Sequence, residues 1–210
     1  DTIDFSSSSD AEITKILKEL NIALSVDEVK KIQFSFLNRP ATLTELVLFS
    51  IQGSEHSSYK SSKNHIKHFL TDGDHVILGA KDDAGVVSLS VDDNGNRYGL
   101  VVSHESHNHP SQIVPYEGAA TGVGGNVRDV CCMGAEVMSL GDSLRFGDID
   151  RNKTKWISDG VVSGIAGYGN PLGIPNICGD LYFDKEYNEN CLVTVLTAGV
   201  VKEKDVIRSK

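Results

Sequence analysis

Residues 98–133 read YGLVVSHESHNHPSQIVPYEGAATGVGGNVRDVCCM, and the expected fold follows from this stretch. It opens with a β-branched run, continues through a polar cluster, His104 to Pro110, and becomes rich in glycine from Gly118 to Gly125. β-Branched runs favour strands, and glycines before an apolar segment are typical of a turn that opens a helix. We therefore predict a strand over 98–106, a glycine-rich turn, and a helix over 126–133.

Strands and helices are expected to alternate on both sides of this stretch. Upstream, β-branched runs predict strands at 76–78 and 86–91, and Asp93-Asn94-Gly95 is a typical hairpin turn before the strand 98–106. Downstream, the pattern predicts strands near 137–146, 177–183 and 192–201 and a helix near 155–166. This organisation is typical of an α+β fold.

The first third of the chain has a helical pattern. Helix start signals occur at Ser9-Asp10 and in the capping boxes Ser25-x-x-Glu28 and Thr42-x-x-Glu45. The apolar residues at helical spacing, which we expect to form packing faces, are Ile13, Ile16, Leu17 and Leu20 after the first signal, and Leu43, Leu46, Val47 and Phe49 after the third. We therefore divide the chain into a helical amino-terminal segment, residues 1–72, and an α/β domain, residues 73–210.

Composition restricts the classes of function. The net charge is −9, and Lys and Arg form no stripe, so we expect no binding to nucleic acid. No apolar run approaches the roughly 20 residues of a membrane span, and the amino terminus lacks the pattern of a signal peptide, so we expect a cytoplasmic protein without a membrane partner. Because the chain begins at Asp1 and stops just after a strand-like run, we expect it to be part of a longer protein.

The cysteines fit the same compartment. None of the four belongs to a C-x-x-C motif, so we expect reduced, buried structural residues and no zinc site built from thiolates; they are Cys131, Cys132, Cys178 and Cys191.

The polar cluster before Pro110 is the densest group of ionisable side chains. If the strand stays extended, alternation points Glu105, His107 and His109 to one face. A carboxylate there could bind Mg²⁺, and an imidazole could transfer protons near neutral pH. Two alternatives are a solvated loop without a role and a zinc site that starts at His107-x-His109. Since no histidine follows His109, a zinc shell would have to recruit histidines from the first half of the chain.

The glycine-rich stretch is a second candidate for binding. It does not contain the G-x-x-x-x-G-K-[ST] pattern of a Walker A loop. Glycines before a helix still let the backbone approach an oxyanion closely. The Arg128 guanidinium could donate two hydrogen bonds to a phosphate, and Asp129 could bind a cation that bridges phosphates. A tight turn without a binding role is equally compatible with the glycines alone. The acids of the segment Asp142 to Asp148, taken singly, are typical of a solvated strand end.

Longer motifs occur in order along the chain. They are Ser54-Glu-His56, Tyr59-Lys-Ser-Ser62, Glu105-Ser-His-Asn-His-Pro-Ser111, Pro115-Tyr-Glu-Gly-Ala-Ala-Thr-Gly-Val-Gly-Gly125, Arg128-Asp129 and Ser143-Leu-Arg-Phe-Gly147. Together these motifs, which lie between about Thr42 and about Val201, closely resemble the phosphoribosylformylglycinamidine synthase family.

The resemblance implies an ATP- and Mg²⁺-dependent ligase of purine biosynthesis in the aminoimidazole-ribonucleotide-synthase-like superfamily. In that family ATP activates the formamide oxygen of formylglycinamide ribonucleotide, and ammonia from a glutaminase subunit or domain displaces the phosphate to give the amidine. The likeness covers only the first amino-terminal domain of a longer synthetase chain. We therefore expect the isolated residues to be inactive without the remainder of that chain.

The resemblance also implies a fold and an assembly. An aminoimidazole-ribonucleotide-synthase N-terminal-like domain has a mixed β-sheet that helices cover on one face. Its open face pairs with a second sheet to form a barrel, so we expect a homodimer through the sheet.

By motif position, the resemblance assigns roles to individual residues. His56 is similar to the first catalytic histidine, His107 to the proton acceptor, and Tyr59 to an ATP contact. The implied Mg²⁺ ligands are Glu105 and Asp129, and the implied substrate contacts are Ser106, His107, Asn108, His109 and Arg128.

Two positions depart from the family pattern. Ser103 stands where the family usually has a lysine that reaches ATP, and Ser57 replaces a cysteine. The loss of a cation at position 103 keeps a second hypothesis open, a catalytically inactive nucleotide- or metabolite-binding module of the same fold.

Overall fold

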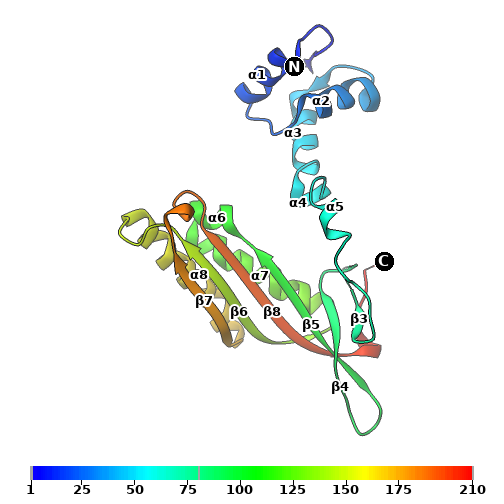
Figure 1. The fold of residues 1–210 in the computed structure, drawn as a ribbon, viewed down its shortest axis with the longest axis vertical. Helices are drawn as coiled ribbons and strands as arrows, with labels where there is room; N and C mark the ends of the chain where they lie inside the picture. The colour runs from blue at the N-terminus through cyan, green and yellow to red at the C-terminus, as the bar shows by residue number, and fades with distance from the viewer. Residues whose placement is uncertain (1, 80, 210) are drawn as a thin grey trace. The chain divides into compact units, whose positions relative to one another are not determined.

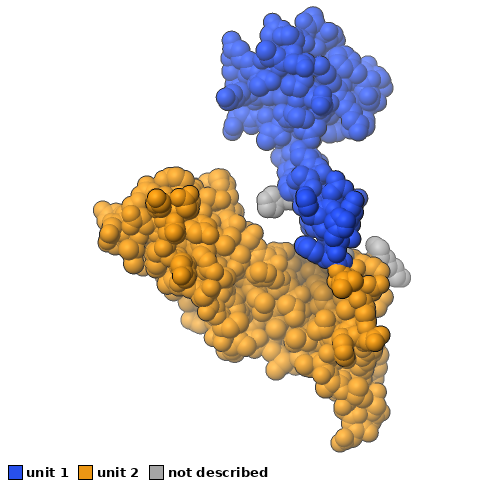
Figure 2. Space-filling model, in the orientation of Figure 1, with its two compact units in different colours: residues 1–69 blue, residues 70–210 orange. Residues whose placement is uncertain are grey.

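The computed structural model describes residues 2–79 and 81–209, except for the side chain of His56. The chain divides into two compact units, unit 1 with residues 1–69 and unit 2 with residues 70–210 (Figure 2). The sequence analysis placed the boundary between the two parts after residue 72, and the structure places it after residue 69. The α+β fold class is confirmed, because helices dominate unit 1 and a mixed sheet with helices forms unit 2.

Unit 1 is built from short helices and a two-stranded sheet around a small apolar core. Its elements are β1 (Thr2–Ile3), α1 (Asp10–Glu19), α2 (Val26–Lys31), the π-helical turn η1 (Ile32–Leu37), β2 (Ala41–Thr42), α3 (Leu43–Gln52), α4 (Glu55–Ser58) and α5 (Lys63–Ile66). Strands β1 and β2 pair antiparallel.

The predicted helix starts in unit 1 are confirmed. Ser9, Ser25 and Thr42 each cap a helix, and the glutamate three residues later bonds back to the N–H of the cap residue at 2.8 Å. The predicted apolar stripes are confirmed only in part: Ile13, Leu17 and Leu46 are buried, whereas Leu20, Leu43 and Val47 are exposed. These helices are short, so only a narrow stripe of each one reaches the core.

Unit 2 contains a six-stranded sheet with the order β3-β4-β5-β8-β6-β7 (Figure 1). Its strands are β3 (Val76–Leu78), β4 (Gly85–Val91), β5 (Arg97–Ser106), β6 (Glu136–Phe146), β7 (Asn176–Phe183) and β8 (Leu192–Lys202), as predicted to within about two residues at each end. Neighbouring strands are antiparallel except β6 and β7. The β4–β5 hairpin turns at Gly95, whose φ of 80° only glycine adopts readily.

Helices cover one face of this sheet (Figure 1). They are α6 (Asn108–Ile113), α7 (Pro115–Cys132) and α8 (Asn152–Leu172), and the short turns η2 (Lys185–Tyr187) and η3 (Glu203–Asp205) flank β8. Apolar residues of α7 and α8, such as Val123 and Val161, pack with Leu144 and Val195 of the sheet. The opposite face carries partly exposed aliphatic side chains, among them Leu100 and Leu196.

The prediction of a glycine-rich turn before a helix at 126–133 is wrong, because α7 already begins at Pro115. The glycines lie inside the helix, where they allow other segments to come close. A Cβ at Gly118 would lie 2.5 Å from the backbone nitrogen of Ser111, and one at Gly122 would lie 2.9 Å from the Cβ of His107. Tertiary packing therefore overrides the low helix propensity of glycine.

The cysteine prediction is also wrong in part. Cys131, Cys132 and Cys178 are exposed free thiols, and Cys191 is buried. Burial raises the pKa of the Cys191 thiol to about 11. Within the described ranges, none of the helices combines the length and the apolar character that crossing a membrane requires.

Replacing Gly164 by alanine should destabilise the chain by about 3 kcal/mol, because the new methyl group would press on the Tyr116 carbonyl where α8 crosses α7. The matched control is Gly167→Ala, whose methyl group would meet the hydroxyl end of the Tyr116 side chain, which can turn away. This control should change the free energy of unfolding by less than about 1 kcal/mol. Urea unfolding followed by circular dichroism measures both variants, and equal losses would contradict a backbone contact as the cause.

Candidate active site

Two carboxylates meet between the end of β5 and helix α7. Glu105 lies near the end of the strand and Asp129 near the end of the helix, where Asp129 is only 7% exposed. Glu105 is exposed as a residue, but partial desolvation of its carboxyl raises the pKa of that group, and the nearby negative charge of Asp129 raises it further. The structure therefore brings together the two acids that the sequence analysis named as Mg²⁺ ligands.

Ser103 and Arg128 surround Asp129. The Ser103 hydroxyl donates a long hydrogen bond of 3.4 Å to Asp129 Oδ2. Arg128 Nη2 lies 3.2 Å from Asp129 Oδ1 and 3.7 Å from Asp83 Oδ1, and its side chain is 66% exposed. The sequence analysis did not identify Asp83, because nothing in its local sequence links it to α7. The single guanidinium of Arg128 thus lies near the carboxylates of Asp83 and Asp129, with Glu105 beside them. Negative charge exceeds positive charge here, and such a site attracts a cation.

His107 follows β5 and lies against α7. Its N–H donates to the Val193 carbonyl at 2.8 Å, and its own carbonyl accepts the Ser111 hydroxyl at 2.6 Å. The imidazole is close to Gly122, where a Cβ would lie 3.3 Å from the ring carbon Cγ. Its Nδ1 is buried and has no hydrogen-bond partner among the described residues. Buried polar atoms in native proteins nearly always have a partner, so this nitrogen is a candidate for contact with a bound molecule.

The prediction that Glu105, His107 and His109 alternate along one extended strand is wrong. β5 ends at Ser106, and α6 begins at Asn108. The Asn108 side chain accepts the Val193 N–H at 2.8 Å, which fixes the chain to β8 as it turns into the helix. His109 and Ser106 are exposed.

The alternate residues Ser103, Glu105 and His107 nevertheless lie in one row against α7. Three contacts define it along α7: Ser103 with Asp129, Glu105 beside Gly125, and His107 against Gly122. The Cβ that Gly125 lacks would lie 3.8 Å from Glu105 Oε2, an ordinary contact distance. The end of β5 therefore presents a carboxylate and an imidazole along one side of α7.

Comparison with known proteins shows the family of the chain. Residues 81–201 match the family described as AIR synthase related protein, N-terminal domain. The chain belongs to the AIR synthase-related family. Residues 13–60 of unit 1 also match the formylglycinamide ribonucleotide amidotransferase linker domain.

Curated relatives of this AIR synthase-related chain are subunits of one enzyme. The chain is 48% identical over 206 residues to the phosphoribosylformylglycinamidine synthase subunit PurL of Methanothrix thermoacetophila, covering 96% of the chain and 26% of that protein. It is 45% identical to the same subunit of Thermoplasma acidophilum, covering 100% of the chain and 28% of that protein. The chain thus spans about a quarter of the length of these relatives.

Solved structures agree with this family. T. maritima PurL complexed with FGAR is 38% identical, with a TM-score of 0.71 over 89% of the chain and 28% of that protein. T. maritima PurL complexed with ATP is 37% identical, with a TM-score of 0.70 over 89% of the chain and 29% of that protein.

The AIR synthase-related domain has a donor set that suits Mg²⁺ better than zinc. Among the residues that the structure describes, no group of three or more His, Cys, Asp or Glu side chains could hold a metal ion. Zinc sites in proteins usually use three or four such ligands. Mg²⁺ keeps several waters and is held by one or two carboxylates together with substrate phosphates. The pair Glu105 and Asp129 fits that second pattern.

The Ser143 to Gly147 motif holds two strands of the AIR synthase-related domain together. Both Arg145 Nη atoms bond the Asp180 carboxylate at 2.8 Å, and the guanidinium lies 5.6 Å from the centre of the Tyr182 ring. The Ser143 hydroxyl donates to the same carboxylate. These contacts join β6 to β7, so the motif has a structural role in this chain.

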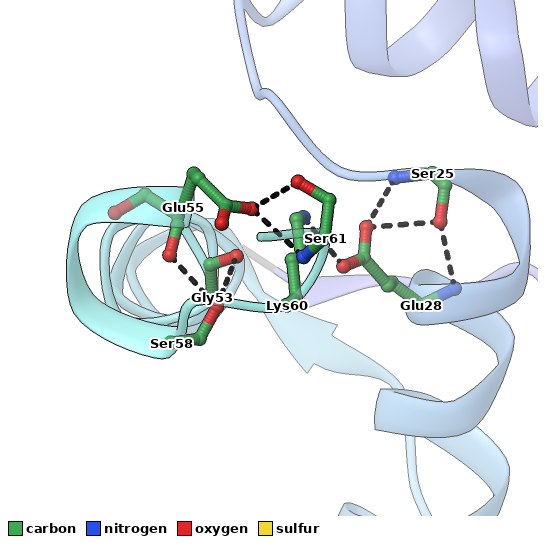
Figure 3. Close-up of polar contacts among 8 residues, drawn as sticks. Ser25, Glu28, Gly53, Glu55, Ser58, Lys60 and Ser61 are labelled. Atoms are coloured by element: carbon green, nitrogen blue, oxygen red, sulfur yellow. Dashed lines mark hydrogen bonds and ion pairs between the residues drawn. The ribbon is translucent and has the colours of Figure 1, made fainter. Parts of the chain in front are cut away.

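The remaining predicted site residues belong to unit 1. Tyr59 ends α4 and is 54% exposed, while the His56 side chain lies outside the described part of the structure. The sequence analysis missed Glu55, although this residue lies inside the quoted motif Ser54-Glu-His56. Its carboxylate accepts bonds from Ser61 beside it (Figure 3).

Proposed function

We propose that this chain is the amino-terminal part of a phosphoribosylformylglycinamidine synthase, an ATP- and Mg²⁺-dependent ligase of purine biosynthesis. The observation that carries the proposal is the pairing of Glu105 with Asp129 in the same row as the His107 imidazole. PurL relatives and the T. maritima PurL complexes with ATP and FGAR support it.

The reaction would use this row of residues as follows. ATP would activate the formamide oxygen of formylglycinamide ribonucleotide, and ammonia would displace the phosphate to give the amidine. Glu105 and Asp129 would hold Mg²⁺, which screens the charge of the transferring phosphoryl group when it is bound. The His107 imidazole would accept a proton from the attacking nitrogen.

Other residues of the chain would bind the substrates. Ser106, Asn108 and His109 follow Glu105 directly, and Arg128 precedes Asp129, so all four would contact formylglycinamide ribonucleotide. In unit 1, His56 would be a second catalytic residue and Tyr59 an ATP contact.

The intact enzyme would need further parts. The remainder of the synthetase chain would complete the pocket, and a glutaminase subunit or domain would supply ammonia in the cytoplasm; the solved PurLQS complex from Thermotoga maritima supports such an assembly. The partly exposed Leu100 and Leu196 on the open sheet face would pair with a second sheet to close a barrel. Alone, the 210 residues would form a homodimer through this face and would be inactive.

An inactive binding module of the same fold is the second candidate, because Ser103 replaces the cation that the resemblance leads one to expect. Calorimetry with a non-hydrolysable ATP analogue and Mg²⁺ separates the two candidates. In the full-length synthase, the Kd of the wild type should lie within about tenfold of that of Ser103→Lys, since Mg²⁺ at Glu105 and Asp129 supplies positive charge to the phosphates.

Ser163→Lys, on the exposed side of α8, controls for an added charge. Turnover of formylglycinamide ribonucleotide with ATP and ammonia by the full-length protein, and not by the 210-residue chain, completes the test. Tight binding that only Ser103→Lys restores, with no turnover by the wild type, would favour the inactive module.

A further inference from the structure

Glu55 organises the segment that carries His56 and Tyr59. Its carboxylate accepts the backbone N–H groups of Ser61 and Ser62 at 2.9 and 2.8 Å, and it also accepts both serine hydroxyls. A carboxylate offers about four acceptor positions, so these four donors use its full capacity. The bonds from the two serines lower the pKa of Glu55 to about 2.

The backbone enclosed by these bonds turns sharply at Tyr59. This residue has φ 50° and ψ 31°, a left-handed conformation that bulky side chains rarely adopt. The other described non-glycine residues with positive φ are Asn21 and Asn38, a residue type that tolerates this conformation. An unusual backbone conformation at an exposed tyrosine therefore requires support from its surroundings.

Glu55 supports this turn from both sides. Its carbonyl accepts the Tyr59 N–H at 2.9 Å, and its carboxylate holds the two serines that follow Lys60. Lys60 is itself anchored, because its Nζ lies 2.7 Å from Glu28 Oε1 (Figure 3). The backbone is thus fixed before and after Tyr59, while the tyrosine side chain stays 54% exposed.

We propose that Glu55 is a positioning residue whose carboxylate fixes the turn that presents Tyr59 to the nucleotide. This role rests on the proposed synthase function, in which Tyr59 contacts ATP. Only a carboxylate satisfies all four serine donors. A glutamine of the same size would direct its NH₂ group at two of them and would open the turn.

Hydrogen exchange of the full-length synthase tests the turn itself. Glu55→Gln should accelerate amide exchange in the peptide that covers residues 60–63 by about tenfold, because one of the two serines loses its acceptor and faces an NH₂ group instead. The matched control is Glu12→Gln, since Glu12 accepts the N–H and hydroxyl of Ser9 in the same unit at 2.8 Å. This control should leave residues 60–63 unchanged. Equal exchange in the wild type and Glu55→Gln would overturn the proposal.

Steady-state kinetics of the same variants test the role in nucleotide binding. Glu55→Gln should raise the KM for ATP by about tenfold and keep kcat within about threefold, whereas Glu12→Gln should change neither. In a Tyr59→Ala background, Glu55→Gln should raise the KM for ATP by less than about twofold, because Glu55 acts by positioning the tyrosine that is then absent. The positioning role would be overturned if the two substitutions raised the KM independently, so that their effects multiplied in the double variant. A fall in kcat without a change in the KM for ATP would also overturn it. A wild type that exchanges as expected but has no synthase activity would instead refute the proposed function.

Discussion

Asp129→Asn in the full-length synthase should lower kcat for amidine formation by about a thousandfold. Asparagine keeps the shape of the side chain and its contact with Ser103, but it removes one of the two charges that would hold Mg²⁺. Phosphoryl transfer depends on charge neutralisation at the phosphates, so the loss should appear in kcat.

Assays over a range of Mg²⁺ concentrations measure this effect and its cause. The variant should need at least about tenfold more Mg²⁺ for half-maximal activity, because Glu105 alone would hold the cation. Asp159→Asn, an exposed aspartate on α8, provides the matched control and should match the wild type. An unchanged Mg²⁺ requirement in Asp129→Asn would show that the carboxylate pair is not the metal site.

His107→Gln should lower kcat by about three orders of magnitude while the KM for ATP stays within about threefold. Glutamine fills part of the space beside Gly122 but cannot accept a proton near neutral pH.

His75→Gln is the control for this substitution, because His75 is exposed and lies before β3. It should retain the wild-type rate and the wild-type KM for ATP. If His107→Gln keeps the wild-type rate, another group accepts the proton. A parallel rise in the KM for ATP would instead indicate that the imidazole contributes to the binding of nucleotide.

Short-range signals account for the elements that were predicted correctly. The capping boxes at Ser25 and Thr42 involve residues within one helical turn, and the β4–β5 hairpin depends on a glycine at its tip. The strands follow from β-branched runs, which are recognisable within a few residues. These features need no knowledge of the rest of the chain.

The start of α7 and the placement of His107 could not be read from local patterns. Gly118 and Gly122 have low intrinsic helix propensity, so a turn was the reasonable prediction. Both glycines are helical because Ser111 and His107 pack directly on them. That packing also ends the extended strand before His109 and still keeps His107 beside the helix.

Residue types and their spacing over a few positions were sufficient to define the α+β class, most of the element positions and the choice of Glu105, His107 and Asp129 as site residues. The pairing of the two carboxylates, the buried nitrogen of His107 and the four bonds to Glu55 became visible only in the folded chain. The physical reason is that capping and alternation act between near neighbours. Burial and charge proximity, in contrast, arise between segments that only the packing of helix on sheet, or the closing of a turn, brings into contact.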